Sequence, residues 1–248
     1  EKKMKKTTKM LAILLAAMTA LSGCGGSGTT TTQTEGKTET TAAAEKTGTE
    51  TAQKGPKDEV VTMAVISSWD TLNIYNTSGN YGNAVADQLF ERLVTRTHDG
   101  VIEPRLATEW QIADDNKSMT FKLAENALWH DGEKLTANDI VFTCKAMTNP
   151  DVDNYYRSAF NVLAGTDDDG VAADTDQVGV EAVDDYTVKF SFKEPKDQDT
   201  ILNAFLSFLY VLPEHILDTG NYADINNSSF WTSPVGAGPF KYVKDTAG

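Results

Sequence analysis

Apolar residues recur at two spacings along this chain, and each spacing predicts one kind of element. Spacings of three and four residues predict amphipathic helices, whereas alternation of apolar with polar residues predicts half-buried strands. Helices are expected from Asn83, after Thr136 and over Thr200–Phe208. Strands are expected over Val60–Ile66, Met119–Leu123, the two arms of a hairpin within Val178–Lys193, Leu209–Leu212 and Lys241–Val243. This mixture predicts an α/β fold.

Turn and capping residues separate these elements. The pairs Asp99-Gly100, Asp131-Gly132 and Asp184-Asp185 are typical turn sequences. Thr136 lies three residues before Asp139 and just ahead of an apolar run, an arrangement that predicts a capping box at a helix N-terminus.

The N-terminus has the pattern of a bacterial export signal. A lysine-rich start precedes the apolar run Met10–Leu21, which is shorter than the roughly 20 residues of a spanning helix. Leu21-Ser22-Gly23-Cys24 resembles the lipobox, which predicts removal of residues 1–23 and lipidation of Cys24. Residues 24–58 have no apolar periodicity and predict a disordered tether. The mature protein is therefore expected outside the cytoplasm, anchored to the bacterial membrane by its lipid.

The charge and the cysteines exclude several classes. A formal net charge of −14 disfavours nucleic acid and anionic headgroups as partners, because both repel it. If Cys24 is lipidated, Cys144 is the one remaining thiol, and an internal disulfide is excluded. Cys144 falls within a predicted helix and is interpreted as a buried apolar thiol.

Enzyme and cofactor motifs are absent from the sequence. His98, His130 and His215 are widely separated, without paired cysteines, so no metal site is expected. Asp167-Asp168-Asp169-Gly170 fails the EF-hand pattern at two ligand positions. Walker, G-x-S-x-G and S-x-x-K motifs are missing. The chain is therefore expected not to be an enzyme and to need no cofactor.

Residues 104–142 contain three ordered sequence motifs: P-R-L-A-T-E-W, then T-F-K-L, then W-H-D-G-E-K-L-T-A-N-D-I-V-F. This closely resembles a segment of the extracytoplasmic solute-binding proteins that feed oligopeptide, dipeptide and nickel ABC importers. Leu209–Ile216 resembles the strand–proline–helix element of that family. Pro234–Phe240 resembles its P-x-G-T-G-P-F/Y turn, with Ala237 in place of the usual threonine.

The resemblance implies a periplasmic-binding-protein-like (type II) α/β fold with two lobes, truncated before the second large lobe. Family members are longer than this chain. The domains implied are residues 59–94 as the first part of lobe I, 95–212 as a small β-rich subdomain, and 213–248 as an incomplete return into lobe I.

The same resemblance implies a carrier that captures peptides and delivers them to ABC permease subunits. Two groups of residues lie where the family lines its cleft. They are Thr77, Ser78, Gly79, Asn80 and Tyr81 in one loop, and Tyr155, Tyr156 and Phe160 in the wall of the small lobe. Each of these aromatic residues could equally pack in the core, and Trp110, Trp129 and Trp231 are interpreted as core residues.

Three alternatives stay open at this point. A carrier of the same fold could take nickel, heme, a metal chelate or an oligosaccharide. A surface adhesin or chaperone-like lipoprotein could use the fold without transport. A secreted hydrolase would turn its ligand over instead of releasing it.

Overall fold

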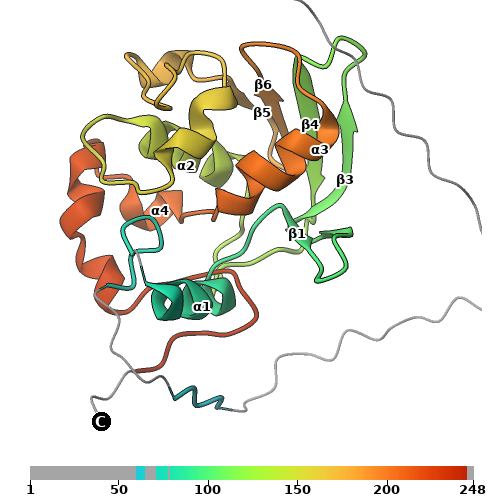
Figure 1. Cartoon of the computed structure of the whole chain (residues 1–248). Coiled ribbons are helices and arrows are strands. Elements are labelled where there is room, and N and C mark those ends of the chain that lie inside the picture. The colour runs from blue at the N-terminus through green and yellow to red at the C-terminus, as the bar shows by residue number, and fades with distance from the viewer. Residues whose placement is uncertain (1–59, 65–70, 78, 245–248) are drawn as a thin grey trace, which may run out of the picture. The chain divides into compact units, whose positions relative to one another are not determined.

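A computed structural model of the chain describes residues 60–64, 71–77 and 79–244 (Figure 1). The predicted signal peptide, Cys24, the predicted tether and Ser78 lie outside these residues. The described residues belong to one unit, Val60–Gly248. Within them, no helix is long and apolar enough to cross a lipid bilayer.

A four-stranded antiparallel sheet has the strand order β3-β4-β6-β5. Its strands are β3 (Ala107–Ile112), β4 (Ser118–Leu123), β5 (Val180–Asp184) and β6 (Thr187–Ser191). The predicted strand around Phe121 and the predicted hairpin are therefore confirmed. In β4 the apolar residues are buried and Lys122 is exposed, so the alternation in sequence is the alternation of the two sheet faces.

Helix α2 (Ala137–Thr148) lies against β5 and β6 and begins at the predicted residue. The Asp139 carboxylate accepts the Thr136 N–H with its Oδ2 at 2.8 Å, as the capping box requires. Its Oδ1 accepts the Glu214 N–H at 3.0 Å, at the start of α4 (Glu214–Leu217). One buried carboxylate thus holds two helix N-termini together.

This arrangement predicts a pH dependence of stability. Burial raises the pKa of Asp139, although N–H groups of Thr136 and Glu214 oppose the rise. The folded state then holds a proton more tightly than the unfolded chain does. Asp139 therefore stabilises the fold below about pH 3.9, the ordinary aspartate pKa, and this contribution is lost as pH rises through the raised pKa.

The Asp139→Asn variant is expected to lack that component. Its free energy of unfolding, measured in urea at several pH values from acid to neutral, should fall less between the ordinary and the raised pKa than that of the parent protein. Burial raises the pKa of Glu91 in both proteins, whereas the raised pKa of Glu214 is due to burial and to the Asp139 charge, so the difference between the curves reports Asp139 together with its effect on Glu214. Parallel curves for the two proteins would contradict this assignment.

Three connected helical turns follow the sheet, where the apolar spacing predicts a helix. They are α3 (Gln198–Thr200), the π turn η3 (Ile201–Phe205) and the 3-10 turn η4 (Leu206–Phe208). Phe205 makes edge-to-face contacts with Phe160 and Phe190, at ring-centroid distances of 5.5 and 5.4 Å. These aromatic contacts join the helical turns to the sheet.

Helix α1 (Asn80–Leu89) begins three residues before the predicted start at Asn83. In Figure 1 it lies below α2 and α4, away from the four-stranded sheet. Phe90 follows the helix in extended conformation and is buried. The apolar spacing therefore predicted its burial correctly, although the residue is not helical. The chain then enters the hairpin β1 (Val94–Arg96) and β2 (Ile102–Pro104), and Gly100 takes a positive φ of 83° in its turn.

Three strand predictions are wrong within the described residues. Residues 60–64, Leu209–Leu212 and Lys241–Val243 have no strand assigned. A strand requires a neighbour that accepts and donates backbone hydrogen bonds, and the described part of the chain supplies no ladder to any of these segments. Leu209–Leu212 is buried, and its Val211 N–H donates to the Glu91 carbonyl at 3.0 Å.

Four short 3-10 turns are the other helical elements among the described residues. They are η1 (Arg157–Val162), η2 (Thr175–Gln177), η5 (Tyr222–Asn227) and η6 (Ser229–Thr232). As expected from its packing role, Trp231 is buried and its indole N–H donates to the Ile225 carbonyl at 2.6 Å. Trp129 is buried as well, and Trp110 packs on Phe121.

The W-H-D-G turn and the glycine-rich turn meet at the end of α1. His130 Nε2 contacts the Gly238 carbonyl at 2.8 Å, and the Gly236 N–H donates to His130 Nδ1 at 3.3 Å. The Gly238 N–H donates to the Leu89 carbonyl at 2.9 Å, at the last residue of α1. The two segments that carry much of the family resemblance therefore form one structural junction, and His130 is a turn and packing residue.

Candidate functional site

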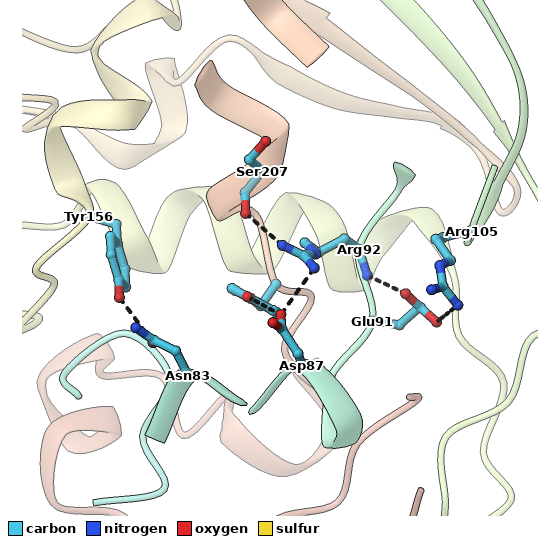
Figure 2. A network of polar contacts seen from close by, with 8 residues as sticks. Asn83, Asp87, Glu91, Arg92, Arg105, Tyr156 and Ser207 are labelled. Carbon is cyan, nitrogen blue, oxygen red and sulfur yellow. Dashed lines mark hydrogen bonds and ion pairs between the residues drawn. The ribbon is translucent and has the colours of Figure 1, made fainter. Parts of the chain in front are cut away.

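Tyr155 and Tyr156 of the second predicted group contact the residues that flank the first group on either side. The Tyr155 N–H donates to the Tyr75 carbonyl at 2.9 Å, just before the first group. The Tyr156 hydroxyl donates to Asn83 Oδ1 at 3.1 Å, on helix α1 (Figure 2). Residues separated by more than seventy positions in the sequence thus line one region.

Aromatic side chains give this region an accessible apolar surface. Tyr156 stacks on Phe208 with ring centroids 5.1 Å apart and an interplanar angle of 21°. Phe208 is 37% exposed and Tyr155 is 63% exposed. Phe208 was not among the sequence candidates, because its helical spacing predicted core packing. Flat exposed rings of this kind can contact a ligand with little loss of side-chain entropy.

Gly79, Asn80 and Tyr81 lie at the start of α1, and this position corrects one expectation. Asn80 and Tyr81 are helical residues in the first turn, whereas a loop was expected. Asn80 is exposed and Tyr81 is half-buried. Among the described residues, no atom lies within 4 Å of a Cβ added to Gly79, so the space beside this backbone can admit a neighbouring group.

Thr77 and Phe160 belong to the core in this structure. Phe160 is 0% exposed and packs against Tyr75 and Phe205. Thr77 is buried, and its Oγ1 would lie 2.1 Å from a Cβ added to Gly82 in α1. Both residues therefore support the surface from beneath, and neither side chain is accessible there. Ser78 lies outside the described residues.

A polar network that the sequence analysis did not single out continues along α1 (Figure 2). Asp87 accepts the Arg92 Nη2–H at 3.0 Å and the Tyr210 hydroxyl at 2.5 Å, both on Oδ1. Arg92 Nη1 donates to the Ser207 carbonyl at 3.1 Å. The available signal was the four-residue spacing of Asn83 and Asp87, which places both on one helix face.

Burial within this network raises the pKa values of two of its side chains. Burial raises the pKa of Tyr210, and the neighbouring Arg92 opposes the rise. Burial also raises the pKa of Glu91, whose Oε1 accepts the Arg92 N–H at 3.1 Å. Arg105 forms a second ion pair with Glu91 at 3.9 Å. The network therefore joins α1, the 207–210 segment and the connection between β2 and β3.

Two other features lie away from these residues. A pocket of about 700 Å3 is lined by Thr108, Glu109, Lys122, Leu123, Glu125, Asp184, Asp185, Tyr186 and Thr187 at the edge of the four-stranded sheet. Cys144 is fully buried, and burial raises the pKa of its thiol. In the described ranges, no cluster of three histidine, cysteine or carboxylate side chains could hold a metal ion.

Comparison with known proteins assigns the class of this fold. CtaP of Listeria monocytogenes, described as an ABC transporter substrate-binding protein, superposes with a TM-score of 0.61 and 29% identity, over 74% of this chain and 34% of CtaP. NikZ of Campylobacter jejuni, solved with Ni(L-His), superposes with a TM-score of 0.58 and 27% identity, over 73% of this chain and 32% of NikZ. The α/β fold is therefore that of the periplasmic binding proteins, as expected.

The family model of bacterial extracellular solute-binding proteins, family 5 Middle, matches residues 101–248. Because this match covers more than half of the chain, the chain belongs to that family. The periplasmic murein peptide-binding protein MppA of Escherichia coli K12 is 34% identical over 155 residues, which are 60% of this chain and 27% of MppA. The chain thus spans about a quarter to a third of the length of these relatives.

Proposed function

We propose that this chain is part of the substrate-binding lipoprotein of an ABC importer. In this proposal it captures oligopeptides or dipeptides outside the membrane, delivers them to the permease subunits and releases them chemically unchanged. The membrane anchor is the lipid on Cys24. The observation that best supports the binding role is that Tyr156 bonds to Asn83 on α1 while Tyr155 bonds to Tyr75, just before that helix.

The chemistry of this surface suits an extended peptide. Side-chain amides, as on Asn80 and Asn83, can donate to and accept from a peptide backbone. The open space beside Gly79 allows a second backbone to approach. Exposed aromatic rings accept side chains of many shapes, so binding need not depend strongly on peptide sequence. Such contacts favour capture and release over covalent chemistry.

The domain boundaries belong to the same proposal. Residues 59–94 and 213–248 would contribute to lobe I, and residues 95–212 would form the small β-rich subdomain. Gly79, Asn80, Tyr81, Tyr155 and Tyr156 would contact the ligand, together with Ser78. Thr77 and Phe160 would hold these residues in place from the core.

A nickel chelate is the second candidate ligand, because NikZ binds Ni(L-His) and superposes on most of this chain. The peptide proposal has the stronger support, since MppA has the higher identity and is named for a peptide ligand. A chelate whose metal is already coordinated could still bind through the aromatic surface.

Calorimetry on the purified protein tests the proposed function. Titration with alanine dipeptide, alanine tripeptide and a nonapeptide is expected to give saturable binding, and chromatography of each mixture should recover the peptide intact. Titration with Ni(L-His)2 is the parallel arm. Binding of the nickel chelate alone would overturn the peptide assignment, and recovery of cleaved peptide would overturn the carrier assignment.

Replacing Tyr155 with alanine is expected to weaken peptide binding about fivefold, because it removes an exposed ring from the proposed contact surface. The free energy of unfolding should change by less than about 0.5 kcal/mol, as is usual for surface positions. Val183→Ala is the matched control, since Val183 is also exposed but lies on β5. Equal peptide affinities for the two variants would remove Tyr155 from the site.

A further inference from the structure

Asn83 and Asp87 place two polar side chains on one face of α1, next to the aromatic stack. They are four residues apart and therefore neighbours on the helix surface. Asn83 accepts from the Tyr156 hydroxyl, and Tyr156 stacks on Phe208. Figure 2 shows Tyr156, Asn83 and Asp87 following one another along this face. Asp87 therefore shares a helix face with Asn83, the residue that contacts the Tyr156–Phe208 stack.

The Asp87 carboxylate keeps capacity for another partner. In the part of the chain that the structure describes, both of its hydrogen bonds, from Arg92 and Tyr210, end on Oδ1. The side chain is 41% exposed. A carboxylate has about four acceptor positions on two oxygens, so Oδ2 can accept from a group outside the protein without displacing the internal contacts.

Arg92 does not present its charge in the same way. Its guanidinium donates to Asp87 and to the Ser207 carbonyl, and it lies 4.7 Å from the centre of the Tyr210 ring. Only 23% of its side chain is exposed. The positive charge is therefore engaged by the protein. The formal net charge of −14 further favours a cation over an anion near this surface.

We propose that Asp87 selects peptides that carry a positively charged side chain. The ammonium of a lysine residue would lie at Asp87 Oδ2, and the apolar part of the peptide would lie against Tyr156 and Phe208. This inference rests on the proposed peptide-binding function and adds a substrate class to it. Tyr210 and Arg92 act through Asp87 as positioning residues, because both donate to its Oδ1 and so fix the orientation of the carboxylate.

Two tripeptides that differ in one ammonium group test this inference by calorimetry. Phe-Lys-Ala and Phe-norleucine-Ala have the same backbone and nearly the same apolar surface. The parent protein is expected to bind the lysine peptide about fivefold more tightly, the upper range for a partly exposed ion pair. Asp87→Asn should bind both peptides equally, whereas Asp87→Glu should retain a preference for the lysine peptide.

Asp176→Asn is the matched control, since Asp176 also forms an exposed ion pair, with Lys145 at 2.6 Å, but lies on η2. It should keep the fivefold preference while losing the same charge. An unchanged preference in Asp87→Asn would overturn the inference and leave the peptide-binding function intact. Absence of binding to both tripeptides and to the alanine peptides would overturn the proposed function, and this inference with it.

Discussion

Gly236→Ala is expected to destabilise the protein by about 3 kcal/mol or to prevent folding, because the added methyl group has no room. A Cβ at this position would lie 1.7 Å from the Leu89 carbonyl oxygen and 2.6 Å from its carbon. The same carbonyl accepts the Gly238 N–H at 2.9 Å. The backbone therefore cannot move away without breaking the junction between α1 and the glycine-rich turn.

The measurement is the free energy of unfolding in urea, followed by tryptophan fluorescence, with the soluble yield as a second readout. Gly79→Ala is the control, because its φ of −91° suits any residue and its added Cβ would meet nothing within 4 Å. That variant should stay within about 0.5 kcal/mol of the parent protein, a typical surface effect. A Gly236→Ala protein of parental stability would show that the turn does not pack on Leu89 as described.

Phe160→Ala should cost about 3 to 5 kcal/mol, as is usual when a buried phenylalanine is truncated. The ring is fully buried, lies 5.5 Å from the Phe205 ring and 6.4 Å from the Tyr75 ring, and links η1 to the rest of the core. Removing the ring would leave a cavity between η1 and the segments that carry Phe205 and Tyr75, which we do not expect to close. Thermal and urea unfolding measure this loss directly.

Phe160→Leu separates a core role from a ligand-contacting role. Leucine keeps most of the buried volume, so the loss of stability should be less than half of that in Phe160→Ala, with peptide affinity unchanged. If Phe160→Leu weakened peptide binding as strongly as Tyr155→Ala while the fold kept its stability, Phe160 would belong to the contact surface. That result would support the ligand-lining role that the sequence predicted for Phe160.

The strand and helix predictions that succeeded rest on neighbouring residues, and the strand predictions that failed depend on a distant partner. The alternation around Phe121 and the spacing of Thr136 and Asp139 depend on neighbouring residues, and β4 and α2 appear where these patterns place them. The β-branched residues of 60–64 and the apolar run Leu209–Leu212 have the composition of strands but no ladder in the described residues. Composition indicates suitability for a strand, whereas pairing depends on a segment elsewhere in the chain.

Some residues of the candidate site could be predicted from the sequence and others could not. Motif resemblance pointed to both segments, and in the structure Tyr156 bonds to Asn83 on α1 while Tyr155 bonds to Tyr75 before it. The sequence could not separate Phe160, which is buried, from Phe208, which is 37% exposed. Both are phenylalanines at apolar positions, and exposure is a property of what packs around them. Asp87 was missed because its four-residue spacing from Asn83 gives no sign of Tyr210 and Arg92, which only the fold places beside it.

By itself, the sequence determined the α/β class, the main hairpin, the capped helix and the family, because periodicity, turn residues and ordered motifs are written in neighbouring positions. Only the tertiary structure decided which aromatic rings are exposed, which segments find strand partners and which carboxylate lies beside the aromatic stack. Burial and hydrogen-bond pairing depend on residues far apart in the chain. They are settled only when those residues meet.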